Sequence, residues 1–275
     1  MKKKKLITNK TALITGATGL LGPKHAEALC EIKFDLVLLD LEEKKLLKVK
    51  KYLNKSYPKS KIHTFKCDIT KEKEVLKVER KLKQLKQNVD VLINNAAINP
   101  KMNSLKTSKK QGRIEDYNIE TLKKELNVNL IGAFICCKIF GSLMAKNKNG
   151  IILNIASDLS INAPDQSVYS KDEKIENVKD FKPIGYSLSK FGIIGLTKYI
   201  STYWGHCGVR CNAIALGAVK HNQPNYLTKN IIKRIPLKRL ATINEYKKTL
   251  CYMCTDASAY MTGETLIIDG GRSAW

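Results

Sequence analysis

The sequence is poor in acidic residues and in arginine. Asp and Glu number 25 against 49 Lys and Arg, which gives a formal net charge of +24. Proteins that read base sequence favour the bidentate guanidinium of arginine, yet only six of these basic residues are arginine. No nucleic-acid-binding motif accompanies the lysines, which are scattered over every predicted helix. We therefore interpret the charge as a solvated surface and expect no specific nucleic-acid partner.

Long apolar runs and linkers are also missing. No uncharged apolar run reaches about 18 residues, which argues against a membrane span. The lysines of residues 1–5 and the apolar stretch after them resemble a signal peptide, but glycines interrupt the stretch and no small-residue cleavage site stands out. No linker rich in proline, glycine or serine, repeat or low-complexity tract divides the chain. We expect one cytoplasmic domain over residues 1–275, with no membrane partner.

Eight cysteines are present, and without a secretion signal they favour reduced thiols over a disulfide framework. Two pairs, Cys207 with Cys211 and Cys251 with Cys254, have a spacing that a zinc site could use. Both pairs fall in predicted helix or strand, where cysteine acts as a small apolar residue. We expect no metal.

Seven short apolar runs are typical of strands buried on both faces of a parallel sheet. Amphipathic helical stretches lie between them, so we predict an α/β, Rossmann-type fold: a doubly wound, seven-stranded parallel sheet between two helical layers. Ligands of such folds bind beyond the carboxyl ends of the strands. The predicted strands cover residues 11–15, 34–39, 62–65, 89–93, 151–155, 209–214 and 266–268, and the predicted helices 20–32, 42–55, 71–87, 119–146, 185–205 and 243–256.

A glycine loop follows the first predicted strand and opens the first predicted helix, as a dinucleotide-binding loop does. Gly16 suits a tight turn, Gly19 allows backbone to approach a pyrophosphate, and Gly22 allows close helix packing. The helix N-terminus would face the negative charge. We infer dinucleotide binding, and the loop residues expected to contact the cofactor also include Thr18, Leu20 and Leu21.

Asp40 ends the second predicted strand, at about the distance from the glycine loop where an acid accepts hydrogen bonds from the adenosine ribose. A carboxylate there repels a 2′-phosphate, and no Lys or Arg lies between Gly16 and Gly22 to compensate. We therefore predict NAD rather than NADP. Asp40 as a simple cap of the next helix is the alternative.

Tyr186 and Lys190 stand one helical turn apart, and an ammonium at this distance is expected to lower the pKa of the phenol, a poor base at its ordinary pKa of about 10. The pair alone is a weak signal, because Tyr57 and Lys61 have the same spacing. Its context decides the interpretation.

In order along nearly the whole chain, further motifs closely resemble those of the short-chain dehydrogenases/reductases. Against the family pattern, Ala97 replaces a Gly, Leu216 a Pro and His221 a Thr. The matching segments are the glycine loop, Cys67-Asp68-Ile69, Asn94-Asn95-Ala96-Ala97, Val128-Asn129-Leu130, Asn154-Ile155-Ala156-Ser157, Tyr186 with Lys190, Val209-Arg210-Cys211-Asn212-Ala213, Thr262-Gly263 and Asp269-Gly270-Gly271.

This resemblance implies the roles of the site residues. Tyr186 would be the general acid or base in hydride transfer between an alcohol and a ketone, and Ser157 would polarise the substrate oxygen. Lys190 would bind the nicotinamide ribose, and Asn129 would hold a water that links Lys190 to solvent. Asp68 and Ile69 would contact adenine. The other cofactor contacts are expected at Asn95, Ala96, Ala97, Gly217 and Val219, and at Tyr186 itself.

An insertion over residues 158–185 separates Ser157 from Tyr186 by about twice the usual family spacing. A long segment that leaves the catalytic strand is expected to form a substrate wall or lid. Asp158, Gln166 and Tyr169 are the predicted substrate contacts within it. With the terminal residues 271–275, it resembles the dehydrogenases of flagellin-modification and surface-sugar pathways. That resemblance implies a sugar, sugar phosphate or nucleotide sugar as the small-molecule substrate.

Two other functions remain open. A 3-oxoacyl-[acyl-carrier-protein] reductase shares the core, and a basic face would suit an acidic carrier protein. A catalytically silent NAD-sensing regulator would keep the fold, but such proteins usually lose one residue of the Tyr–Lys pair. The family resemblance also implies a homodimer or homotetramer, formed through the helices predicted at 119–146 and 185–205.

Overall fold

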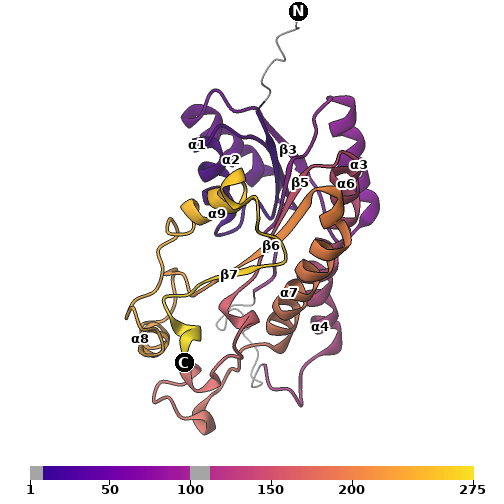
Figure 1. Ribbon diagram of the computed structural model, residues 1–275. Coiled ribbons are helices and arrows are strands. Elements are labelled where there is room, and N and C mark those ends of the chain that lie inside the picture. The colour runs from indigo at the N-terminus through magenta and orange to yellow at the C-terminus, as the bar shows by residue number, and fades with distance from the viewer. Residues whose placement is uncertain (1–8, 100–111) are drawn as a thin grey trace, which may run out of the picture.

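A computed structural model describes residues 9–99 and 112–275 of the chain. In it, seven strands form one sheet in the order β3-β2-β1-β4-β5-β6-β7, and every neighbouring pair is parallel (Figure 1). The predicted fold class is confirmed. The strands are β1 (Thr11–Thr15), β2 (Asp35–Asp40), β3 (Ile62–Lys66), β4 (Val91–Asn94), β5 (Gly150–Ile155), β6 (Val209–Leu216) and β7 (Thr265–Ile268).

The central strands lie between two apolar layers. In β1, Ala12 and Ile14 point into one hydrophobic cluster and Leu13 points into the other, because successive strand side chains face opposite sides. All three side chains are fully buried. This two-sided burial explains why the strands read as continuous apolar runs.

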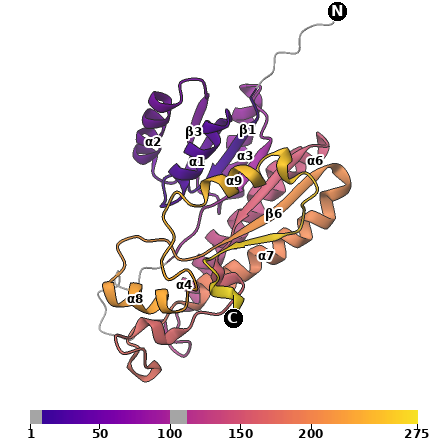
Figure 2. The same ribbon diagram turned by 60° about the vertical axis from the view of Figure 1, so that its left-hand side comes forward.

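Helices cover both faces of the sheet. Helices α1 (Gly22–Glu31), α2 (Glu43–Ser56) and α9 (Lys247–Met253) lie on one face. Helices α3 (Glu72–Gln84), α5 (Gly132–Cys136) and α6 (Ser142–Lys146) lie on the other, together with α7 (Ile184–Trp204). Figures 1 and 2 show the two groups on opposite sides of the sheet.

The helical run Ile119–Lys146 is continuous but uneven. It begins as α4 (Ile119–Leu126) and contains two π-helical segments, Asn127–Ile131 and Cys137–Gly141. By length and composition alone it could cross a membrane, yet 56% of its most apolar window is buried. It packs against α3, α7 and the sheet, which is the packing of a core helix.

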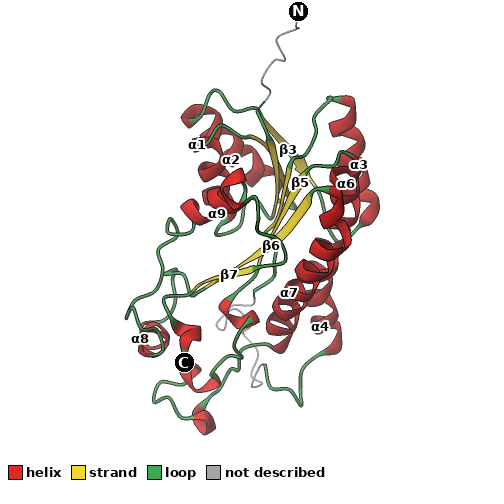
Figure 3. Cartoon of the chain, in the orientation of Figure 1, coloured by secondary structure: helices red, strands yellow, loops and turns green. Residues whose placement is uncertain are grey.

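The segments beyond the carboxyl ends of the strands differ most from the prediction. Helix α8 (Asn225–Lys233) was not predicted, and α9 is shorter than the predicted 243–256. The 158–185 insertion contains three short 3-10 helices. The rest of it is mostly loop, drawn in green in Figure 3. One of them, η4 (Gln166–Tyr169), packs against α8. The insertion and α8 therefore form one layer beyond the carboxyl edge of the sheet.

Candidate active site

A cleft of about 1310 Å³ lies along the carboxyl ends of the strands. The strand order reverses between β1 and β4, and a doubly wound sheet binds its ligands beside such a reversal. Nearly all the predicted site residues line this cleft. They are Gly16, Thr18, Gly19, Leu20, Leu21, Asp40, Asp68, Ile69, Asn95, Ala96, Ala97, Ser157, Asp158, Tyr169, Tyr186, Lys190, Gly217 and Val219.

The glycine loop has the tight geometry that its glycines permit. Gly16 has a φ of +61°, and a Cβ there would lie 2.6 Å from the Cα of Ala96. At Gly22, a Cβ would lie 2.6 Å from the Gly16 carbonyl oxygen. Gly22 does not line the cleft, so its contribution is the close seating of α1 against the loop.

Asp40 lies at the end of β2 and bridges two loops. Its carboxylate accepts hydrogen bonds from the backbone N–H of Thr18 at 2.9 Å and of Glu42 at 3.2 Å. The bond to Glu42 is a local turn contact before α2, whose N-cap residue is Glu42 and which has no side-chain cap, so the capping alternative is wrong. The bond to Thr18 fixes the carboxylate beside the glycine loop. Asp40 also lines the cleft, on its cofactor side.

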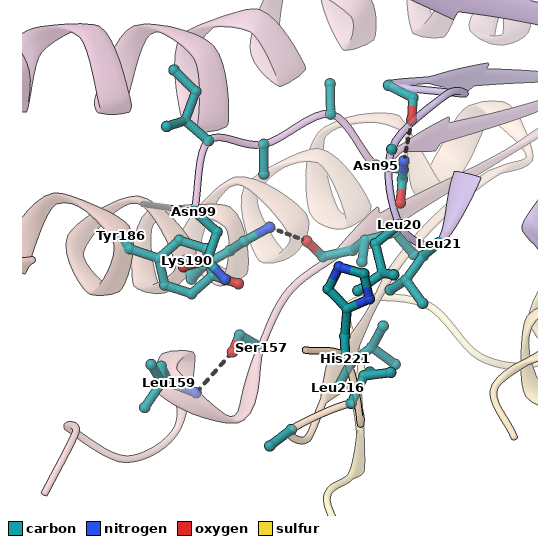
Figure 4. A pocket seen from close by; sticks show the side chains of 18 of the residues that line it. Leu20, Leu21, Asn95, Asn99, Ser157, Leu159, Tyr186, Lys190, Leu216 and His221 are labelled. Atoms are coloured by element: carbon teal, nitrogen blue, oxygen red, sulfur yellow. Dashed lines mark hydrogen bonds between the residues drawn. The ribbon is translucent and has the colours of Figure 1, made fainter. Parts of the chain in front are cut away.

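Asn95 and Asp68 hold neighbouring loops. The Asn95 amide donates to the carbonyl oxygens of Thr15 and Gly16 at 2.9 and 3.0 Å, so it clamps the glycine loop from β4 (Figure 4). Asp68 accepts from the backbone and hydroxyl of Thr70. Burial raises the pKa of Asp68, but these hydrogen bonds outweigh it and leave the pKa lowered. Asp68 therefore faces the cleft as a carboxylate.

Three of the four predicted catalytic residues meet in the cleft. Ser157 follows β5, and Tyr186 and Lys190 lie on the first turns of α7 (Figure 4). The Lys190 ammonium donates to the Ile155 carbonyl at 2.6 Å and lies 5.7 Å from the centre of the Tyr186 ring. The Ser157 hydroxyl donates to Asp158 at 2.9 Å.

The pKa of Tyr186 is raised, contrary to the prediction. Burial raises it to about 12, and a hydrogen bond with Ser157 opposes this rise only in part. Burial also lowers the pKa of Lys190 to about 8. The cost of burying both charges therefore outweighs their attraction across one helical turn. In this fold the phenol is protonated at neutral pH.

Asn129 is near the site but does not line the cleft. Its amide accepts from the Ile98 N–H at 2.6 Å and donates to the Ile98 carbonyl and the Ser189 hydroxyl, both at 3.0 Å. It lies in the first π-helical segment of the long helical run. These contacts tie the loop after β4 to α7; the water relay stays a prediction.

The insertion forms a wall of the cleft, as expected. Pro164, Val168 and Tyr169 line it, and Asp158 pairs with Arg272 of the C-terminal 3-10 helix Arg272–Ala274. Burial is the main cause of the raised pKa of Tyr169.

Gln166 is a correction. Its amide binds both the N–H and the carbonyl of Lys182, at 2.8 and 3.3 Å, and it does not line the cleft. It closes the loop of the insertion and is not placed to contact substrate.

Several cleft residues were not predicted. Lys182 lines the cleft beside Tyr186, and its place at the end of the insertion was the available signal. His221, noted only as a departure from the family pattern, also lines the cleft (Figure 4). Gln223, Tyr226 and Leu227 come from α8 and the loop before it, where no helix was predicted.

The cysteines show no site of their own. Cys211 and Cys254 are buried, whereas Cys207 and Cys251 are half-buried. Across residues 9–99 and 112–275, no group of three or more His, Cys, Asp or Glu side chains is arranged to hold a metal ion.

Comparison with known proteins gives matches over nearly the full length. The family model described as enoyl-(acyl carrier protein) reductase matches residues 16–273. The NAD-dependent glycerol dehydrogenase of Listeria innocua is 28% identical over 96% of this chain and 94% of its own length. Sorbitol-6-phosphate 2-dehydrogenase of Escherichia coli K12 is 26% identical over 96% of this chain and 98% of its own length. The 3-oxoacyl-[acyl-carrier-protein] reductase of Buchnera aphidicola is 30% identical over 96% of this chain and 97% of its own length.

Solved structures have the same fold. An NAD⁺-bound xylitol dehydrogenase superposes with a TM-score of 0.82 at 24% identity, covering 97% of this chain and all of its own. A short-chain dehydrogenase of Leptospira borgpetersenii with bound NAD⁺ gives a TM-score of 0.80 at 27% identity, covering 97% of this chain and 93% of its own. Because the family model and the relatives span almost the whole sequence, the chain belongs to the short-chain dehydrogenase/reductase family of oxidoreductases.

Proposed function

We propose that this protein is an NAD-dependent oxidoreductase that interconverts a secondary alcohol and a ketone on a polyol or sugar derivative. The observation that carries the proposal is the convergence of Ser157, Tyr186 and Lys190 in the cleft that the glycine loop also lines. Each residue is common alone, but a hydroxyl, a phenol and an ammonium beside a dinucleotide loop form a coherent set for this reaction.

The cofactor side of the cleft fits a dinucleotide. A Cβ at Gly16 would collide with Ala96, so this cradle depends on glycine. Gly19, Asp40 and Asp68 line the same end, where they would meet pyrophosphate, ribose and adenine. When bound, NAD supplies the hydride acceptor. The carboxylate of Asp40 favours NAD over NADP by repulsion of a 2′-phosphate, and the names of the glycerol and xylitol dehydrogenases are consistent with NAD.

The catalytic residues manage the substrate proton. The protonated phenol of Tyr186 can donate its proton to the substrate oxygen during reduction, and must accept one during oxidation. The ammonium of Lys190 favours the phenolate that oxidation needs, although burial opposes it. Ser157 is placed beside Tyr186, and its hydroxyl would polarise the substrate oxygen by turning its one hydrogen from Asp158 to that oxygen.

The relatives point to the substrate class. The names of two relatives specify glycerol and sorbitol 6-phosphate, and a gluconate 5-dehydrogenase of Burkholderia cenocepacia has the same fold. We therefore place polyols and their acid or phosphate derivatives first. A role in surface-glycan or flagellin modification, with a nucleotide sugar as substrate, stays a prediction.

Tyr186→Phe tests the proposal. We expect NAD binding, measured by calorimetry, to persist, and turnover of a polyol panel to fall by at least about a hundredfold, because general acid–base catalysis is lost. Absorbance of the reduced cofactor reports turnover. Tyr57→Phe is the matched control, since Tyr57 also precedes a lysine by four residues but contacts Glu31 outside the cleft. Unchanged turnover in Tyr186→Phe would refute the mechanism.

A second candidate is reduction of a 3-oxoacyl group on an acyl carrier protein. The 30% identity to the Buchnera reductase favours it, and the net positive charge suits an acidic carrier. Acetoacetyl carrier protein is the probe. Faster turnover of this probe than of any polyol would select the second candidate, whereas NAD binding without turnover of either would select a cofactor-sensing protein.

A further inference from the structure

Lys182 is a buried cation at the substrate end of the cleft. It ends the 158–185 insertion, only 8% of its surface is exposed, and it lines the cleft. Its ammonium lies 4.5 Å from the centre of the Tyr186 ring and donates to the Asn99 side chain. Lys182 therefore stands where a substrate held against Tyr186 would pass.

The two arginines at this end of the cleft are already neutralised. Arg272 pairs with Asp158. Arg234 pairs with Asp165 and Glu173. In contrast, no carboxylate in the described part of the chain lies within salt-bridge distance of Lys182.

Two carboxylates and one aromatic ring, from three different parts of the fold, face Lys182. Glu125 of α4 and Asp158 after β5 both favour its protonated form, and the Tyr186 ring of α7 lies beneath it. Glu125 does not line the cleft, and its carboxylate accepts from the Tyr117 hydroxyl at 2.9 Å. Burial nevertheless lowers the pKa of Lys182 to about 8, so the ammonium is predominantly charged at neutral pH.

Within residues 9–99 and 112–275, the hydrogen-bonding capacity of this ammonium is also incompletely used. An ammonium has three N–H donors, and the described residues accept from one of them, through Asn99. Burying a charge without full pairing is costly, and an anion in the cleft would supply the missing partner. A neutral hydroxyl would supply much less.

We propose that Lys182 binds an anionic group, a carboxylate or a phosphate, carried by the polyol substrate. The proposal rests on the function proposed above, and it narrows the substrate to polyol acids or polyol phosphates. Lys182 is then a specificity-determining residue supplied by the insertion. Tyr186 and Ser157 bind the oxygen on the reacting carbon, while Lys182 binds the charged end of the substrate.

The experiment compares Lys182→Met and Lys182→Arg with the wild type. The substrates are sorbitol, gluconate and sorbitol 6-phosphate, with NAD. Lys179→Met is the matched control, because Lys179 is an exposed lysine of the same insertion that does not line the cleft. Circular dichroism checks that each variant is folded.

We expect Lys182→Met to lower the ratio of kcat/KM for the preferred anion to kcat/KM for sorbitol by about ten- to a hundredfold, mainly through KM. Lys182→Arg keeps most of the ratio because the charge remains, and Lys179→Met leaves it unchanged. The anion that shows the larger loss identifies carboxylate or phosphate as the group recognised.

An equal loss for sorbitol and both anions would overturn the proposal, since Lys182 would then act through the Tyr186 ring. No loss for any substrate would overturn it as well. If the wild type turns over none of these substrates, the proposed function fails, but the anion site can still be tested. Calorimetry then measures whether gluconate or sorbitol 6-phosphate binds to the complex of the protein with NADH. Binding that Lys182→Met abolishes supports the anion site, and absence of binding overturns it.

Discussion

At the residue scale, Asp40 combines two contacts that a substitution can separate. Its carboxylate carries the charge expected to repel a 2′-phosphate and also accepts the Thr18 N–H. Asp40→Asn removes the charge and keeps an acceptor for Thr18. We expect the ratio of kcat/KM with NADP to that with NAD to rise about tenfold or more, measured with one substrate.

The control for this charge effect is Glu43→Gln, on the exposed first turn of α2 outside the cleft. It should leave the cofactor ratio unchanged. A preference for NADP already present in the wild type would contradict the role given to Asp40.

His25 provides a prediction about stability. It is buried in α1, neither ring nitrogen has a hydrogen-bond partner among the described residues, and burial lowers its pKa to about 4. Between that value and the unfolded pKa of about 6.5, the unfolded chain binds more protons, so stability falls as the pH falls. This one group should cost about 2 kcal/mol of unfolding free energy at pH 5 relative to pH 7.5.

Urea denaturation of His25→Leu at both pH values measures that contribution. The variant should lose about this much of the pH dependence, whereas His206→Leu, which removes an exposed histidine, should retain it. Equal pH dependence in wild type and His25→Leu would show that His25 is not the group responsible.

At this scale, the sequence predicts which residues form the site better than it predicts the burial and the hydrogen-bond partners of their side chains. Residue type and order were enough to place Ser157, Tyr186 and Lys190 in one cleft. They were not enough for the Tyr186 pKa, because the burial of a phenol depends on residues far away in the chain. Gln166 was misplaced for the same reason: its partner Lys182 is 16 residues away and is met only when the loop closes.

At the element scale, Asn230 holds α8 against the insertion. Its buried amide donates to the carbonyl oxygens of Val168 and Ser170 at 3.1 and 2.8 Å. Asn230→Ala leaves both carbonyls without this donor, which should lower the free energy of local unfolding of the insertion by about 1–3 kcal/mol. We expect faster amide hydrogen exchange over residues 165–177 and a several-fold higher KM.

Lys229→Ala is the matched control, since Lys229 is the exposed neighbour on the same helix. Its exchange should match the wild type. If exchange over residues 165–177 is unchanged in Asn230→Ala, the insertion is held without α8.

Elements differed in how well the sequence predicted them. The strands were found within two residues of their ends, because a buried parallel strand is marked by its own apolar run. Helix α8 was missed although its nine residues are amphipathic, with Leu227 and Asn230 buried. It packs against the insertion, where Asn230 donates two hydrogen bonds, and the sequence did not show that a helix was needed there.

At the scale of the whole molecule, α5 and α7 present exposed apolar side chains on the outside of one layer. Phe134, Leu188 and Phe191 are each nearly half exposed, and Tyr199 is more so. We propose that a second copy of the chain covers this face. Phe191→Glu would place a charge in that interface, so light scattering should show a loss of dimer or tetramer to monomer.

Leu47→Glu is the control for this substitution. Leu47 is an exposed apolar residue of α2, in the opposite helical layer. It should keep the wild-type mass. A monomeric wild type would contradict the proposed interface.

The ion pair between Asp158 and Arg272 has a consequence for synthesis of the protein. The two residues are 114 positions apart, and Asp158 also receives the hydrogen of the Ser157 hydroxyl. A ribosome that has reached residue 271 has already released the glycine loop, Tyr186 and the insertion, yet Asp158 still lacks its guanidinium partner. The cofactor-binding half of the nascent chain can thus fold early. The ion pair of Asp158 beside Ser157 forms only after β7 and the turn that follows it have emerged.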